Sequence, residues 1–128
     1  MRSNDVMTKK ALIVDDAEPN RILIGAIVSK LGVQVEYAED GDEAVQKFVV
    51  VEPDIVIIDQ IMPRKNGSEA IVEMKQLRPA FTAVLMSALT STENIREIME
   101  SCGAEEFLPK PISSAVISAV LTKYGVIG

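Results

Sequence analysis

The sequence has no histidine and no tryptophan, and it contains one cysteine, two tyrosines and three phenylalanines. Without histidine the chain lacks the commonest general base and metal ligand, so a bound metal would be held by oxygen atoms, which favours hard cations such as Mg²⁺. The lone Cys102 excludes an internal disulfide, and we expect it to be a small buried or half-buried side chain near a helix end. With so few aromatic residues, the hydrophobic core must be aliphatic.

Long apolar runs are also absent. No stretch approaches the roughly 20 residues of a membrane span, and the polar, charged start of the chain does not resemble a signal peptide. We therefore expect a cytoplasmic protein without a membrane partner. The net charge of −6 argues against direct binding to nucleic acid. A length of 128 residues predicts one domain over 1–128, with a polar extension at 1–8 and a core from about 9 to 124.

Short aliphatic runs alternate with longer amphipathic stretches along the whole chain. The runs cover residues 11–14, 33–38, 54–58, 83–86 and 105–108. This alternation is typical of βαβ units. It predicts an α/β fold: a flavodoxin-like, doubly wound (βα)5 domain whose five-stranded parallel sheet has the order 2-1-3-4-5. The third run is apolar throughout, which predicts a central strand covered on both faces.

Residues with strong helix-end preferences lie between these runs. Pro19 suits the first turn of the first helix. Asp40 and Ser113 are predicted to cap the second and fifth helices. Thr90 and Glu93 have the spacing of a capping box ahead of the fourth helix.

Polar side chains follow four of the five predicted strands. Asp15 and Asp16 come after the first strand, Asp59 after the third, Ser87 after the fourth and Lys110 after the fifth. Carboxyl ends of parallel strands meet at one rim of the sheet, where such folds bind ligands. Singly, either of the first two aspartates could cap a helix, the serine could be a loop hydroxyl and the lysine a solvated charge. Together, three clustered carboxylates repel one another and predict a site for a divalent cation.

The motifs at these strand ends resemble those of receiver domains of two-component response regulators. The matching motifs are Val14-Asp15-Asp16, Asp59 with Pro63 and Gly67, Ser87-Ala88, and Lys110-Pro111. The resemblance covers the chain from about residue 9 to 124. It is specific, because separate motifs occur in the right order on the right elements.

The resemblance implies a phosphorylation-dependent signalling switch. Asp59 would accept a phosphoryl group from a phosphohistidine of a sensor histidine kinase or histidine phosphotransfer protein. Asp16 and Asp59 would bind Mg²⁺ directly, together with the backbone carbonyl of Ile61, and Asp15 would reach the metal through water. The domain would not be an enzyme in the usual sense, because it would catalyse only its own phosphorylation and dephosphorylation.

The resemblance also implies how the phosphoryl group would be detected. Lys110 would pair with its oxygens and Ser87 would donate a hydrogen bond to it. The Lys110–Pro111 peptide bond is expected to be cis, which aims the lysine inward. Phe107 matches the family's aromatic switch residue, which would change the surface of the fourth helix, fifth strand and fifth helix and so control an output partner or domain. Phe107 could equally be an ordinary core aromatic of an edge strand.

Two apolar residues stand two positions beyond the expected acceptor and hydroxyl, Ile61 and Leu89. We hypothesise that they exclude or fail to orient the attacking water, so that loss of the phosphoryl group is slow. Other interpretations are a Mg²⁺-dependent phosphatase with an aspartyl nucleophile and a non-phosphorylated scaffold. The phosphatase is disfavoured because such enzymes typically carry a second aspartate where Ile61 stands. The cognate kinase, the output target, a phosphorylation-dependent homodimer and a longer parent regulator are left open by the sequence.

Overall fold

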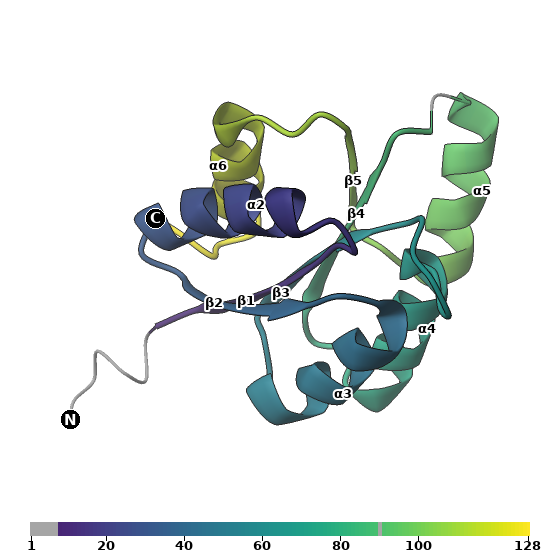
Figure 1. Ribbon diagram of the computed structural model, residues 1–128, viewed down its shortest axis with the longest axis horizontal. Helices are drawn as coiled ribbons and strands as arrows, with labels where there is room; N and C mark the ends of the chain where they lie inside the picture. Colours follow the sequence, from purple (N-terminus) through teal and green to yellow (C-terminus); the bar gives the residue numbers. More distant parts are fainter. Residues whose placement is uncertain (1–7, 90) are drawn as a thin grey trace.

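A parallel sheet of five strands forms the centre of the computed structural model, which describes residues 8–89 and 91–128 (Figure 1). The strands are β1 (Lys10–Val14), β2 (Gln34–Ala38), β3 (Ile55–Asp59), β4 (Thr82–Ser87) and β5 (Glu106–Pro109). They pair in the order β2-β1-β3-β4-β5, and every neighbouring pair is parallel. The predicted flavodoxin-like α/β fold and its strand order are confirmed.

Five helices alternate with the strands and cover both faces of the sheet. They are α2 (Glu18–Lys30), α3 (Gly41–Val51), α4 (Gly67–Leu77), α5 (Thr92–Cys102) and α6 (Ser114–Lys123). In Figure 1, α2 and α6 lie on one side of the sheet, and α3, α4 and α5 lie on the other. Each crossover therefore returns the chain to the same rim of the sheet, where all five strands end.

The core consists of two hydrophobic layers, one on each face of the sheet. Val56 and Ile58 of β3 pack with side chains of α3, α4 and α5. The alternate residues Ile55 and Ile57 pack with α2 and α6. All five residues of β3 are buried, as predicted for a central strand. The core is mostly aliphatic, also as expected.

The predicted helix starts are largely confirmed. Pro19 lies in the first turn of α2. The Asp40 carboxylate accepts a hydrogen bond from the backbone N–H of Glu43, and the Ser113 hydroxyl accepts one from Val116, so both residues cap their helices.

Two helix starts differ from the sequence-based interpretation. The N-cap of α5 is Ser91, whose hydroxyl accepts from the N–H of Asn94, so the predicted capping box at Thr90 and Glu93 is one residue too early. Thr90 itself lies outside the described residues. The N-cap of α2 is Ala17, which makes no side-chain capping bond, and neither preceding aspartate has that position. Adjacent polar residues make the cap position ambiguous in a sequence.

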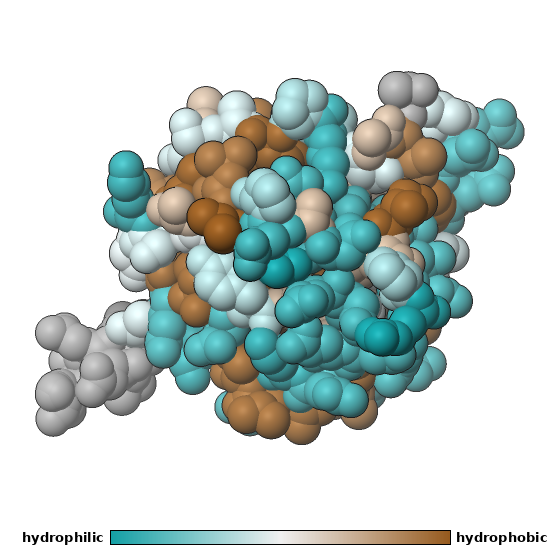
Figure 2. Space-filling model, viewed as in Figure 1, coloured by the Kyte–Doolittle hydropathy of each residue, from teal (hydrophilic) through white to brown (hydrophobic). Residues whose placement is uncertain are grey.

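Two further features were expected from the sequence: no membrane-spanning helix and a small buried cysteine near a helix end. Within the described parts of the chain, none of the helices has the length and apolar character needed to cross a membrane. Cys102 is a free, buried thiol at the end of α5, as expected. Figure 2 shows polar side chains over much of one face, with an apolar patch at its lower edge. The exposed large apolar residues of the protein include Val49 and Val50 of α3.

Candidate functional site

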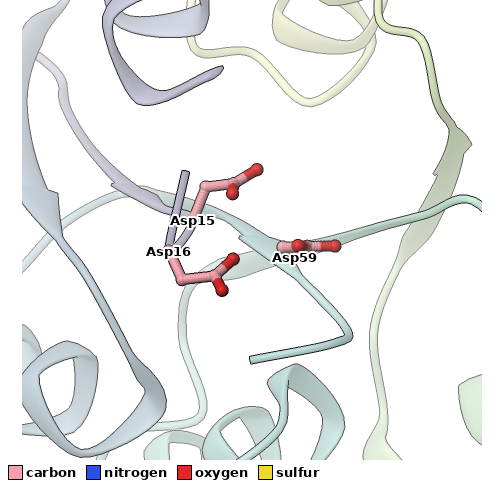
Figure 3. Close-up of side chains that lie close together, drawn as sticks. All are labelled: Asp15, Asp16 and Asp59. Carbon is pink, nitrogen blue, oxygen red and sulfur yellow. The ribbon is translucent and has the colours of Figure 1, made fainter. Parts of the chain in front are cut away.

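Three carboxylates meet where two adjacent central strands end. Asp15 and Asp16 directly follow β1, and Asp59 is the last residue of β3, the strand with which β1 pairs (Figure 3). One carboxylate oxygen from each lies within 4.8 Å of the others. Asp15 and Asp59 are buried, whereas Asp16 is exposed. The strand-end cluster predicted from the sequence is therefore present, and its exposed member gives it access to solvent.

The Lys110 ammonium group lies between the two buried carboxylates. Its Nζ atom is 3.0 Å from Oδ2 of Asp15 and 3.1 Å from Oδ2 of Asp59. Its backbone N–H donates to the carbonyl of Ser87 (2.9 Å), which connects the ends of β4 and β5. The Lys110–Pro111 peptide bond is cis, as expected. Lysine and both aspartates thus form one charged network across three strand ends.

The electrostatics of this network leave an excess of negative charge. Burial raises the pKa of the Asp59 carboxyl, and the charges of Asp15 and Asp16 add to the rise, although Lys110 opposes it. For Lys110, burial alone would lower the pKa, but its hydrogen bonds to the two carboxylates outweigh this and raise the pKa, so it stays protonated. One ammonium group faces three carboxylate side chains in this network.

The donor set of the cluster fits a hard divalent cation. All three side chains offer carboxylate oxygens, and no softer nitrogen or sulfur ligand belongs to the group. Mg²⁺ and Ca²⁺ prefer such oxygen donors. A divalent charge would offset the repulsion that raises the pKa of Asp59. This agrees with the expectation of a metal site and does not distinguish between these cations.

Ser87 ends β4 beside the cluster and is almost completely buried, with 1% of its surface exposed. Its Oγ atom accepts a hydrogen bond from the backbone N–H of Leu89 (3.1 Å). Because a hydroxyl can accept and donate at once, its hydrogen remains suitable for donation to a ligand. The hydroxyl therefore has the geometry of an oriented donor at the rim.

The other predicted site residues lie around this rim with different exposures. The Ile61 side chain is 65% exposed, and Leu89 is half-buried. Phe107 is partly buried and packs against the hydrophobic layer formed with α3, α4 and α5. This packing agrees with the core-aromatic interpretation of Phe107. Its role as a switch stays a prediction.

Gly67 is needed because α4 begins directly against the end of β3. A Cβ atom at this position would lie 2.4 Å from the backbone oxygen of Asp59 and 2.9 Å from a methyl group of Leu85. The methyl group of Leu85 could move aside, but the contact with the Asp59 oxygen would require a shift of the backbone. The glycine in the motif after Asp59 thus has a steric reason, which is the close approach of a helix to the backbone of the candidate site.

The polar contacts that hold the start of α4 against the end of β3 were not predicted from the sequence. Asn66 and Glu69 form a capping box at the start of α4, and their spacing in the sequence would have revealed it. The Gln60 side chain exchanges two hydrogen bonds with Ser68. No sequence pattern predicts this pair, because the two residues meet only when α4 packs against β3.

Sequence and structure comparisons find similar proteins that match almost the whole chain. Residues 11–122 match the sequence model of the response regulator receiver domain. The chain is 36% identical over 118 residues to the chemotaxis protein CheY of Thermotoga maritima, covering 91% of this chain and 98% of that protein. Its structure is similar to that of Vibrio cholerae chemotaxis protein CheY4, with a TM-score of 0.86, 26% identity, and coverage of 91% and 98% of the two chains.

A second solved structure is similar over an even larger share of this chain. It is the complex of CheX, CheY, BeF3 and Mg²⁺ from Borrelia burgdorferi, with a TM-score of 0.84 and 25% identity. The match covers 97% of this chain and 95% of that chain.

Proposed function

Because the chain belongs to the response regulator receiver domain family, we propose that it is a signalling switch phosphorylated on the carboxylate of Asp59. One observation carries the proposal: at the ends of the central strands, the Asp59 carboxylate lies close to those of Asp15 and Asp16 and 3.1 Å from the ammonium group of Lys110. The partner that supplies the phosphoryl group is a sensor histidine kinase or a histidine phosphotransfer protein, and the setting is cytoplasmic.

The transfer step uses the ionised form of Asp59. One of its oxygens forms a bond to the phosphorus of the partner's phosphohistidine. The phosphorus–nitrogen bond breaks, and its electron pair stays on the leaving imidazole. The product is an acyl phosphate on Asp59. A carboxylate nucleophile has no proton to lose, so this step needs no general base, which agrees with the absence of histidine from the chain.

Asp16, Asp59 and the backbone carbonyl of Ile61 are the proposed direct ligands of Mg²⁺, with Asp15 reaching it through water. When bound, the cation supplies positive charge to the phosphoryl oxygens. The oxygen-only cluster supports this assignment. So does the presence of Mg²⁺ and BeF3 in the complex of the similar CheY from Borrelia burgdorferi.

Lys110 and Ser87 are the proposed detectors of the phosphoryl group. Lys110 already lies 3.1 Å from Asp59, and the Ser87 hydroxyl ends the neighbouring strand. A hydrogen bond to a charged group contributes about 1.5–3 kcal/mol. Two such bonds made only in the phosphorylated state approach the roughly 5.5 kcal/mol that inverts a 1:99 equilibrium. At the upper end of this range, these two residues would supply enough free energy for a switch, provided that Lys110 exchanges its present contacts for the phosphoryl oxygens.

The output of the switch is a changed surface on α5, β5 and α6. Movement of Ser87 toward the phosphoryl group would draw the loop after β4 with it, and Phe107 on β5 would turn inward in response. That surface would bind an output partner or domain, or a second phosphorylated copy of this chain.

Beryllofluoride treatment tests the proposal. In the presence of Mg²⁺, the amide NMR signals of Asp59, Ser87 and Lys110 should shift in the wild-type protein, with further shifts along α5 and β5. Asp59→Ala should remove these shifts, whereas Asp54→Ala, at the opposite end of β3, should keep them. Identical spectra of the wild type with and without beryllofluoride would contradict the proposal. Turnover of a small phosphoester by the purified protein would instead favour a phosphatase.

A further inference from the structure

Gln60 directly follows the proposed acceptor and is buried, with 6% of its surface exposed. Its backbone N–H donates to the carbonyl of Met86 in β4 (2.8 Å), and its backbone carbonyl accepts from Gly67 (3.0 Å). Its side-chain oxygen accepts from the N–H of Ser68 (2.8 Å), and its side-chain nitrogen donates to the Ser68 hydroxyl (3.0 Å). Both backbone groups and both side-chain groups of Gln60 are thus engaged.

Through these bonds Gln60, which lies outside α4, caps the N-terminal end of that helix. The first N–H groups of a helix have no partner within the helix. In α4, the N–H of Gly67 and the N–H of Ser68 both donate to Gln60. The next N–H, from Glu69, donates to Asn66. Two of the first three donors of α4 are therefore satisfied by the residue beside Asp59.

The same contacts hold the segment that carries the proposed cation ligands. On one side of Gln60, the Asp59 backbone oxygen touches Gly67 so closely that no Cβ atom fits there. On the other side, Ile61 exposes its side chain to solvent, and Met62 packs against the core. Because Ile61 has no buried side chain to anchor it, the position of its carbonyl depends on the neighbouring residues.

We propose that Gln60 is a positioning residue for the cation site, which joins the end of β3 to the first turn of α4 and so fixes the Asp59 carboxylate and the Ile61 carbonyl. This role rests on the proposed function, since it presupposes Mg²⁺ binding at Asp59. Residues that orient metal ligands typically change metal affinity 10- to 100-fold when they are replaced.

The test replaces the amide of Gln60 by an apolar side chain of similar length. Gln60→Met removes both bonds to Ser68, and we expect the Mg²⁺ dissociation constant from NMR titration to rise about tenfold. Hydrogen exchange of the Ser68 amide should accelerate as well. Gln76→Met makes the same chemical change at an exposed position near the end of α4 and should alter neither quantity. Gln60→Glu keeps a side-chain oxygen that can accept from the Ser68 N–H and should retain protection of the Ser68 amide.

A purely structural role would give a different result. If Gln60→Met lowers the stability to urea but binds Mg²⁺ as tightly as the wild type, the positioning role is wrong while the proposed function stands. Should Gln60→Met fail to fold, Ser68→Ala removes the bond from the Gln60 side-chain nitrogen to the hydroxyl, together with the bond from the hydroxyl to Asn66, and keeps the bond from the Ser68 N–H to Gln60. It should weaken Mg²⁺ binding by a smaller factor, and unchanged binding would again contradict the inference. A wild-type protein that binds no Mg²⁺ contradicts both the proposed cation site and this role.

Discussion

At the scale of single residues, the position of the Asp59 carboxylate that supports its proposed role also lowers the stability of the fold. Its carboxylate is buried beside those of Asp15 and Asp16, and burial is the main cause of its raised pKa. Lys110 relieves this only in part, because it also contacts Asp15. The buried position of the Asp59 carboxylate therefore destabilises the metal-free protein at neutral pH.

We predict that Asp59→Asn stabilises the metal-free protein at neutral pH. The folded pKa of Asp59 lies above its ordinary value of 3.8, so the folded wild type binds the proton more tightly than the unfolded chain. The contribution of Asp59 to stability is therefore fully present below 3.8 and is lost as the pH rises through the folded pKa. The advantage of Asp59→Asn should disappear in acid. Urea unfolding in EDTA at several pH values measures this, and a less stable variant at neutral pH would contradict it.

The exposed Ile61 side chain leads to a kinetic prediction. If it keeps the attacking water from the acyl phosphate, Ile61→Asn should speed loss of the phosphoryl group severalfold by providing a polar group that orients water. The decay can be timed by intact mass after removal of the phosphodonor. Val50→Asn makes a comparable change on α3, where the side chain is 82% exposed, and should leave the rate unchanged. Equal decay rates in Ile61→Asn and the wild type would refute the hypothesis.

At the scale of elements, α4 begins in close contact with the end of β3. Gly67→Ala should destabilise the fold by about 1–3 kcal/mol, the range for overpacking, because its Cβ would meet the Asp59 carbonyl. It should also weaken Mg²⁺ binding. Gly32→Ala is the comparison: Gly32 has a φ of 89° but no neighbour within 4 Å of the added atom. It should lower stability through backbone strain alone and leave Mg²⁺ affinity intact, as urea unfolding and titration would show.

The strands could be predicted from the sequence, whereas several contacts between the elements could not. Apolar runs located all five strands, because a parallel sheet buried on both faces requires them. The strand-end aspartates followed from that placement. The predicted strand order also brought Lys110 to the same rim, although it lies 95 residues from Asp15. Its ion pairs with Asp15 and Asp59 were not predicted, because they depend on how the side chains pack in the fold. The capping of α4 by Gln60 was missed for the same reason. The start of α5 was misplaced because Ser91 competes with its neighbour as the cap.

At the scale of the whole molecule, the net charge of −6 and the cluster of three carboxylates lead us to expect that divalent cations stabilise the fold. We predict that Mg²⁺ stabilises the wild type by about 2.7 kcal/mol at 100 times its dissociation constant. Asp16→Asn should lose most of this gain, because it removes the exposed ligand while the two buried carboxylates keep Lys110. Thermal unfolding with MgCl2, against NaCl of equal ionic strength, measures the effect. Equal gains in both proteins would place the cation elsewhere.

The intact mass of the protein after incubation with acetyl phosphate and Mg²⁺ tests directly whether Asp59 accepts a phosphoryl group. We expect the wild type to gain the mass of one phosphoryl group. The gain should be absent when EDTA removes Mg²⁺ and absent in Asp59→Ala. Asp54→Ala should be phosphorylated like the wild type. An unmodified wild type, or a phosphoryl group that persists on Asp59→Ala, would contradict the assignment of Asp59 as the acceptor.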